Sequence, residues 1–262
     1  DKFLKRLGKS DIPHSWSTRL PLDPSLWVRV RWKELEQEAP TEIPEGFISP
    51  ELLLYRLIME SSEPVTLVPI GSLTNIALLL RTYPSCIPHI KEILMMGGSW
   101  RMPGAKGLAE FNILVDPESA RIVFDSPLHI TMFGLDVTKK QPVYPDDIVL
   151  WKEIPSSFIR DIYTNAVAFM QARAMRDGYA TPYSFFHDGM PVMASSHPEF
   201  FTFRDCTITV DTEGTYTRGM TIVDFKDRSA SGFKHRIAID VDATSYLSTV
   251  LETISNAWGA IK

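Results

Sequence analysis

Short apolar runs separated by stretches of helical spacing characterise the middle of the chain. Residues 65–70, 92–96 and 129–134 form largely apolar runs of the length of buried strands. Between these runs, apolar side chains recur every three or four positions, which is the spacing of an amphipathic helix. The same patterns predict strands over residues 206–212, 220–225 and 236–241, and helices that begin at residues 49 and 116 or span residues 72–82, 156–176, 188–196 and 243–261.

This order of elements indicates the fold class. Strands that alternate with helices through short connections are typical of βαβ units, whose strands pair in parallel. We therefore predict an α/β fold with a mostly parallel central sheet flanked by helices. The chain contains no internal repeat, low-complexity tract or linker, so we expect residues 1–262 to form a single domain.

The part of the chain before residue 49 follows a different pattern. Residues 2–7 have the spacing of the last turns of a helix, and Gly8 suits the position directly after a helix end. We interpret residues 11–13 as the end of a short strand. Residues 14–48 are rich in Pro, Trp and charged side chains without a regular period, which predicts a long excursion over the surface.

Composition and charge exclude several classes of protein. The net charge is −5, and the 27 Lys and Arg residues are scattered along the chain, which argues against a nucleic-acid-binding protein. Cys86 and Cys206 make neither a disulfide framework nor a metal cluster. No apolar run reaches the roughly 18 residues of a membrane span, and the first residues are too charged for a signal peptide, so we expect a cytoplasmic protein.

Polar residues that follow the predicted strands are candidates for a binding site. In open parallel sheets, ligands bind beyond the carboxyl ends of the strands. Residues 70–75, residues 96–98 and the loop before Glu110 meet this condition, and His187 and Asp188 stand before a short predicted helix. Taken singly, each has a structural explanation, since Asp188 fits the N-cap of that helix and the loop residues fit a solvated surface.

Several segments, taken together and in order, resemble nucleoside hydrolases. Residues 68–77 read VPIGSLTNIA, where that family usually has VPTGPLTNIA, and residues 91–98 read KEILMMGG, similar to KEVVLMGG. The further matches are AEFNI at 109–113, DPE at 116–118, GLDVT at 134–138, HD at 187–188 and TRGMT at 217–221. Order and spacing agree from about residue 50 onwards, which is a stronger signal than any isolated motif.

The resemblance implies an enzyme that hydrolyses the N-glycosidic bond of ribonucleosides to ribose and free base, as in purine and pyrimidine salvage. In that family one calcium ion binds the ribose hydroxyls and the attacking water, a role that suits a hard cation held by oxygen ligands. The resemblance also implies a small-molecule nucleoside as substrate and a homodimer or homotetramer, with neither a nucleic acid nor a membrane as partner.

The family's site residues can be carried over position by position. The resemblance assigns calcium binding to the Asp188 carboxylate and the Ile70 carbonyl, ribose or pocket-wall contacts to Met96, Glu110, Phe111 and Asn112, and proton donation to the leaving base to His187. Protonation of the base makes it a better leaving group.

The sequence also departs from the family's pattern at its start. The acidic DxDPGxDD motif, which follows the family's first strand and supplies its main calcium carboxylates, has no counterpart here. We therefore expect the single domain to be N-terminally incomplete, without that first strand. One explanation is a separate N-terminal segment, and the other is a natural truncated relative. The first is favoured, because buried backbone groups left unpaired in a sheet are costly.

Rival functions follow from these departures. Gly104 stands where many members have a ribose-contacting Asn, and residues 189–193 differ from the usual run after the HD pair. The main alternative is a catalytically inactive binding or assembly protein that lacks the acidic metal motif. If the acidic motif is needed for hydrolysis, we expect this chain alone to bind calcium weakly and to hydrolyse nucleosides negligibly. A dinucleotide-dependent oxidoreductase is disfavoured, because no G-x-G-x-x-G motif follows a predicted strand.

Overall fold

The structure is a computed structural model, and it describes residues 4–5, 7–15, 22, 47–104, 107–154, 156–228 and 232–259. The chain divides into two compact units. Unit 1 comprises Asp1–Ile12, Asp136–Thr202 and Ala238–Lys262, and unit 2 comprises Pro13–Leu135 and Phe203–Ile237. The expected single domain stays a prediction.

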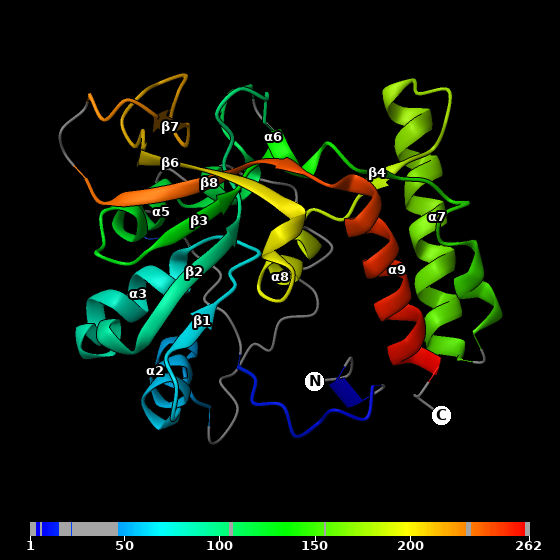
Figure 1. Ribbon diagram of the computed structural model, residues 1–262, viewed down its shortest axis with the longest axis horizontal. Helices are drawn as coiled ribbons and strands as arrows, with labels where there is room; N and C mark the ends of the chain where they lie inside the picture. Colours follow the sequence, from blue (N-terminus) through cyan, green and yellow to red (C-terminus); the bar gives the residue numbers. More distant parts are fainter. Residues whose placement is uncertain are drawn as a thin grey trace. The chain divides into compact units, whose positions relative to one another are not determined.

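A six-stranded sheet with the strand order β1-β2-β3-β8-β6-β7 is the central element (Figure 1). Its strands are β1 (Val65–Leu67), β2 (Ile90–Met96), β3 (Ile130–Phe133), β6 (Phe201–Val210), β7 (Thr221–Asp224) and β8 (Lys234–Val241). The pairs β1–β2, β2–β3 and β3–β8 are parallel, whereas β6 and β7 pair antiparallel. The predicted α/β fold with a mostly parallel sheet is therefore confirmed.

The helices of unit 2 pack along the first strands of the sheet. They are α2 (Pro50–Glu60), α3 (Thr74–Thr82), the 3-10 helix η3 (Pro84–His89), α4 (Phe111–Val115) and α5 (Pro117–Phe124). Helix α3 contacts both α2 and α5 (Figure 1). Helix α2 begins with Pro50 directly after Ser49, because the missing N–H of proline costs nothing in the first helical turn. Fully buried side chains such as Leu79, Ile93 and Phe124 form the core.

Unit 1 has a core of its own. Its elements are α6 (Leu135–Thr138), β4 (Pro142–Val143), η4 (Val149–Glu153), α7 (Ser157–Asp177), β5 (Ser184–Phe185), α8 (Gly189–Ala194), η5 (Pro198–Phe200) and α9 (Ala243–Gly259). Trp151, Ile159 and Met170 are buried together, and Leu247 and Leu251 of α9 pack against them. Helix α7 ends at Gly178 with φ 73°, the left-handed conformation that glycine adopts most easily.

Some predictions about local structure were wrong. Residues 11–13 form a turn and a bend rather than a strand end, because Ile12 N–H donates to the carbonyl of Lys9 and Pro13 has no N–H to donate to a strand partner. Strand β1 ends at Leu67 rather than residue 70, and β6 begins five residues earlier than residue 206. Gly8 has the predicted left-handed backbone, with φ 66°. Most of the excursion over 14–48 lies outside the described residues.

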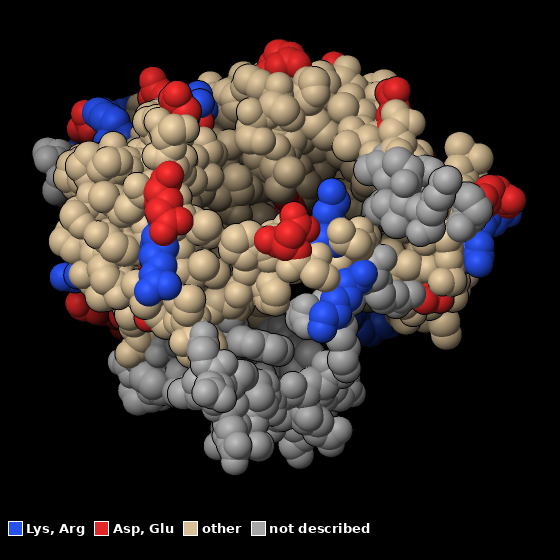
Figure 2. Space-filling view, turned by 90° about the horizontal axis from the view of Figure 1, so that it is seen from below, with Lys and Arg blue, Asp and Glu red and all other residues tan. Residues whose placement is uncertain are grey.

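Charged side chains of both signs are mixed on the surface. On the described part of the face drawn in Figure 2, basic and acidic side chains are interspersed among a majority of uncharged residues. Among the described residues, no helix combines the length and apolar character needed to cross a membrane.

Candidate functional site

A buried carboxylate organises the turn between Gly98 and α4. Glu110 is 5% exposed and caps α4, accepting hydrogen bonds from the N–H groups of Asn112 at 2.9–3.0 Å and Ile113 at 3.3 Å. It also accepts one from Gly98 N–H at 3.0 Å. Burial raises the pKa of Glu110, and the backbone N–H donors oppose that shift. Glu110 thereby ties the start of α4 to the end of β2.

Asn112 connects this turn to the ends of the first two strands. Its Nδ2 donates to the Met96 carbonyl at 3.1 Å and to the Ile70 carbonyl at 3.4 Å. Both hydrogens of the amide group therefore have acceptors, while Oδ1 accepts no hydrogen bond from the described residues. The fixed amide leaves an acceptor for a ligand hydroxyl. Phe111 is half-buried beside it, and Ile70 is 47% exposed.

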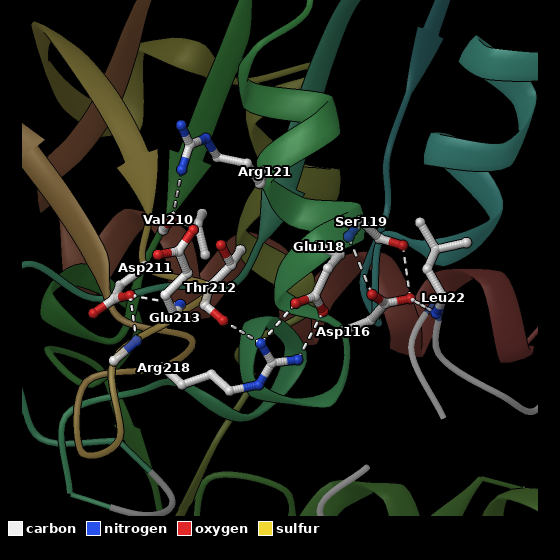
Figure 3. Close-up of polar contacts among 11 residues, drawn as sticks. Leu22, Asp116, Glu118, Ser119, Arg121, Val210, Asp211, Thr212, Glu213 and Arg218 are labelled. Atoms are coloured by element: carbon white, nitrogen blue, oxygen red, sulfur yellow. Dashed lines mark hydrogen bonds and ion pairs between the residues drawn. The ribbon is translucent and has the colours of Figure 1, made fainter. Parts of the chain in front are cut away.

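Asp116 holds the other end of α4. It is fully buried, and its carboxylate accepts from the hydroxyls of Thr74 and Ser119, each at 2.6 Å. The N–H groups of Ser119 and Leu22 donate to it as well, at 3.1 and 3.0 Å (Figure 3). The sequence indicated only a helix cap at Asp116. The link to Thr74, 42 positions away, joins α4 to the turn that follows Ile70.

In unit 1, His187 lies between β5 and α8. Its Nδ1 lies 2.7 Å from the hydroxyl oxygen of Thr138, which is itself fully buried. Burial lowers the pKa of His187 to about 4, and the positive charges of Lys139 and Arg173 lower it further. The imidazole is therefore neutral at pH 7 and carries one N–H. The GLDVT motif contains Thr138, but sequence reasoning gave this hydroxyl no role.

Asp188 is not held by hydrogen bonds in the way that Glu110 is. Asp188 occupies the N-cap position of α8, but its side chain makes no capping hydrogen bond to the helix. Burial raises the pKa of the Asp188 carboxyl, and its charge contributes to the raised pKa of Tyr246. The Tyr246 hydroxyl donates to the Phe186 carbonyl instead, at 2.9 Å. The Asp188 carboxylate is thus free of an internal capping role.

An aromatic cluster adjoins His187, and the sequence analysis missed it. The Phe185 and His187 rings have centroids 5.2 Å apart, and Tyr183 packs edge-on against Phe185 at 5.5 Å. Tyr179 lies 5.1 Å from Tyr183, and the Arg173 guanidinium lies 5.2 Å from the Tyr183 ring. The aromatic density between residues 179 and 187 was the available signal.

The described residues alone do not complete a calcium site. Calcium takes about six to eight oxygen ligands. Asp188 supplies one carboxylate in unit 1, and the Ile70 carbonyl in unit 2 already accepts from Asn112. Within the described ranges, no three His, Cys, Asp or Glu side chains are grouped as a metal site requires. We therefore derive no chemical step through calcium.

The predicted residues fall into separate groups, one in each unit. Unit 2 brings together the Asn112 amide, the Ile70 and Met96 carbonyls and the cap Glu110. Unit 1 carries His187 and Asp188. Gly104 cannot be replaced by asparagine on this backbone, because a Cβ there would lie 1.8 Å from the Ala109 carbonyl oxygen.

Comparisons with known proteins identify the family of this chain. The family model described as "Inosine-uridine preferring nucleoside hydrolase" matches residues 19–248. The pyrimidine-specific ribonucleoside hydrolase RihA of Enterobacter sp. (strain 638) is 33% identical over 262 residues, covering 97% of this chain and 82% of that protein. The non-specific ribonucleoside hydrolase RihC of Klebsiella pneumoniae is 36% identical over 202 residues, covering 76% of this chain and 64% of that protein.

Solved structures show the same fold. The plant nucleoside hydrolase PpNRh1 superimposes with a TM-score of 0.83 at 22% identity, over 97% of this chain and 84% of that one. A purine-preferring ribonucleoside hydrolase from Gardnerella vaginalis gives a TM-score of 0.74 at 26% identity, over 81% of this chain and 67% of that one. With the family model matched over most of its length, the chain belongs to the inosine-uridine preferring nucleoside hydrolases, a family of N-glycosidases.

Proposed function

We propose that this protein hydrolyses the N-glycosidic bond of ribonucleosides and releases ribose and free base. The observation that carries the proposal is the Asn112 amide, whose Nδ2 is committed to the Met96 and Ile70 carbonyls. Its Oδ1 is left to accept a hydrogen bond from a ribose hydroxyl. RihA and RihC, the relatives named above, act on pyrimidine ribonucleosides and on ribonucleosides without base specificity, respectively.

Glu110 and Met96 support the sugar in this proposal. Oε2 of Glu110 accepts from the N–H groups of Gly98, Asn112 and Ile113, whereas Oε1 accepts from Asn112 and retains a lone pair that can accept a ribose hydroxyl. Met96 is buried and turns its sulfur towards the Asn112 amide at 3.4 Å, where the half-buried Phe111 also stands. A site fixed by so many hydrogen bonds orients the sugar before the bond breaks.

His187 assists the leaving base. We assign the Thr138 hydroxyl as donor to Nδ1, which leaves the single ring proton on Nε2. Because the imidazole is neutral at pH 7, it stabilises negative charge on the departing base by donating a hydrogen bond from Nε2. The neighbouring Phe185 ring offers an apolar surface on which a planar base can stack.

Asp188 provides an acceptor for the attacking side of the reaction. Its carboxylate belongs to an exposed residue and can accept a hydrogen bond from water or bind a cation. Calcium is proposed as the ion of this protein because its family typically depends on it. Since one carboxylate supplies only part of a calcium coordination shell, a calcium titration of the wild type and of Asp188→Asn tests this point separately from catalysis.

The assembly and location are further parts of the proposal. We expect a homodimer or homotetramer in the cytoplasm that acts in purine and pyrimidine salvage, with nucleosides as its substrates. Light scattering coupled to size-exclusion chromatography distinguishes these assemblies from a monomer.

The decisive experiment measures ribose release from uridine, cytidine and inosine by the purified protein, with and without added calcium. Asn112→Ala and Asp188→Asn are the test variants, and Asp146→Asn, an exposed carboxylate, is the matched control. Ribose release that both test variants lower, and that the control retains, supports the proposal. Nucleoside binding by calorimetry without any ribose release overturns it in favour of the inactive binding protein.

A further inference from the structure

The loop between β6 and β7, residues 211–220, contacts the segment that carries Glu110 and Asn112. Arg218 makes the principal contact. Its Nη1 and Nη2 donate to the two carboxylate oxygens of Glu118 at 2.6 and 2.8 Å (Figure 3). The same Nη1 donates to the Thr212 carbonyl. The paired side chains are only 18% and 28% exposed, so solvent screens this two-point ion pair less than a surface one.

Gly219 packs against the same segment. Its φ of 83° lies in the region that favours glycine. A Cβ at this position would lie 3.0 Å from the Leu114 Cα and 3.2 Å from the Ala109 Cβ. The loop backbone therefore lies directly on both ends of the segment that bears Glu110 and Asn112. Any change in the loop's path is transmitted to that segment by contact.

Thr221 extends the contact to the end of β2. It is 2% exposed, and its hydroxyl both accepts from Ser99 N–H at 2.9 Å and donates to the Ser99 carbonyl. Ser99 directly follows Gly98, whose N–H donates to Glu110. The Thr-Arg-Gly-Met-Thr sequence at 217–221 thus contacts the chain on both sides of Asn112. It contacts Ser99, which precedes Asn112 in the sequence, and Glu118, which follows it.

The loop itself is well held. The Asp211 carboxylate accepts from the N–H groups of Glu213 and Gly214, each at 2.9 Å, and from the Thr217 hydroxyl. Gly219 N–H donates to the Asp211 carbonyl at 2.7 Å. These bonds close the loop on itself before it reaches Glu118. The loop can therefore act as a stiff brace rather than as a flexible cover.

We propose that Arg218 is a positioning residue for nucleoside hydrolysis, which braces α4 through Glu118 and fixes the direction of the Asn112 amide. The expected effect on catalysis rests on the proposed function, whereas the contact between Arg218 and Glu118 does not. The planar guanidinium matches both oxygens of Glu118 at once. A lysine at this position keeps the charge but makes one contact in place of two, so the first turn of α5 and the adjoining α4 lose their fixed orientation.

The experiment compares Arg218→Lys with Arg176→Lys in the full protein. Arg176 on α7 makes a two-point contact with the carboxylate of Asp177, its side chain is 71% exposed, and it serves as the matched control. The readouts are the thermal midpoint, kcat and KM for uridine, and the NMR resonances of the Asn112 side-chain amide, assigned from the Asn112→Asp spectrum. We expect Arg218→Lys to stay folded at 25 °C, to shift the Asn112 resonances and to lower kcat about 10-fold with KM changed less. Glu118→Gln should shift the same resonances.

Results that overturn the inference are distinct from those that overturn the proposed function. Unchanged Asn112 resonances and unchanged kcat in Arg218→Lys show that Arg218 does not position the site. A fall in activity that merely follows the fraction of unfolded protein shows a structural role only and equally overturns it. If the wild type hydrolyses no nucleoside, the proposed function fails, whereas the Asn112 resonances still decide whether the brace exists.

Discussion

Two regions that carry the candidate site residues differ in how their charged groups are satisfied. Around α4, Glu110 and Asp116 are almost fully buried, yet each accepts several hydrogen bonds from backbone N–H groups or hydroxyls. At the start of α8, Asp188 is exposed and makes no capping bond, and among the described residues Thr138 is the one hydrogen-bond partner of His187. Internal hydrogen bonds hold both carboxylates of the first region, whereas the Asp188 carboxylate of the second region makes no capping hydrogen bond.

This difference teaches how each region can work. A buried carboxylate with its full set of donors fixes geometry, because any movement breaks bonds that water cannot replace. An accessible carboxylate without such donors can bind a group from outside the protein, and perturbed pKa values concentrate at functional sites. The raised pKa of Asp188 and the lowered pKa of His187 both arise mainly from burial. Mutations should therefore affect the rigidity of the region around α4 and the reactivity of the region at the start of α8 separately.

The largest effect is expected where the rigid region loses its anchor. Asp116→Ala leaves the hydroxyls of Thr74 and Ser119 and the N–H of Leu22 without their acceptor. We expect the free energy of unfolding to fall by about 3 kcal/mol, measured by urea denaturation. Asp146→Ala, at an exposed position, should change it by less than about 0.5 kcal/mol. Equal stability of the two variants would falsify the claim that α4 is anchored by Asp116.

The next effect separates binding geometry from stability. Asn112→Ala removes the amide that donates to the Met96 and Ile70 carbonyls and offers Oδ1. We expect kcat/KM for uridine to fall about 100-fold, because an oriented group that contacts the transition state is lost. Stability should fall far less than in Asp116→Ala, since Asn112 is only half-buried. The comparison breaks down if Asn112→Ala unfolds the protein but spares its activity.

A smaller effect is expected in the reactive region. Thr138→Val keeps the shape of this buried side chain but removes the hydroxyl at 2.7 Å from His187 Nδ1. Without that partner the imidazole loses its fixed tautomer and ring orientation, so kcat should fall about 10-fold. Thr138→Ser retains the hydroxyl and is the control that should keep most of the activity. A steady-state assay at pH 7 is sufficient, and equal rates for both variants would contradict the assignment.

Much of the fold was predictable because local patterns determine it. The β2 run from Ile93 to Met96 is buried on both faces, and it therefore appears in the sequence as a continuous apolar stretch. Strand limits were less predictable. Strand β6 begins at Phe201, earlier than predicted. The polar residues Thr202, Arg204 and Asp205 interrupt the apolar pattern there, so the sequence did not indicate this start. Such exposed strand positions lack the apolar pattern from which strands are recognised.

The site was predictable only in part, for a related reason. The family motifs gave the positions of Glu110, Asn112 and His187, and the structure supplies the partners of each. Those partners lie far away in the sequence, as with Thr138 and His187, which are 49 positions apart. Local sequence determines which residue caps a helix, as it did for Asp116, but not which distant hydroxyl donates to it. Contacts between sequence-distant segments require the three-dimensional fold.

The smallest effect tests whether burial of a histidine by itself indicates a reactive region. His235 in β8 is 1% exposed, its Nε2 donates to the Phe124 carbonyl at 2.8 Å, and its Nδ1 has no partner among the described residues. Burial lowers the pKa of His235 below its usual value of 6.5, and the nearby His129 lowers it further, while the Phe124 carbonyl and Asp125 oppose the shift. His235 therefore resembles His187 in desolvation but has no assigned chemistry.

The sign of the pH effect follows from the lowered pKa of His235. Below pH 6.5 the unfolded chain binds a proton that the folded protein resists, so His235 favours folding above that pH and its contribution is lost as the pH falls. Between pH 7.5 and 5.5, the wild type should lose about 1 kcal/mol more unfolding free energy than His235→Gln, which keeps a donor for the Phe124 carbonyl. His89→Gln, at an exposed position, should behave as the wild type. If His235→Gln retains full nucleoside hydrolysis at pH 7.5, a desolvated histidine alone does not make a site, and the distinction between the two regions depends on the unpartnered carboxylate of Asp188.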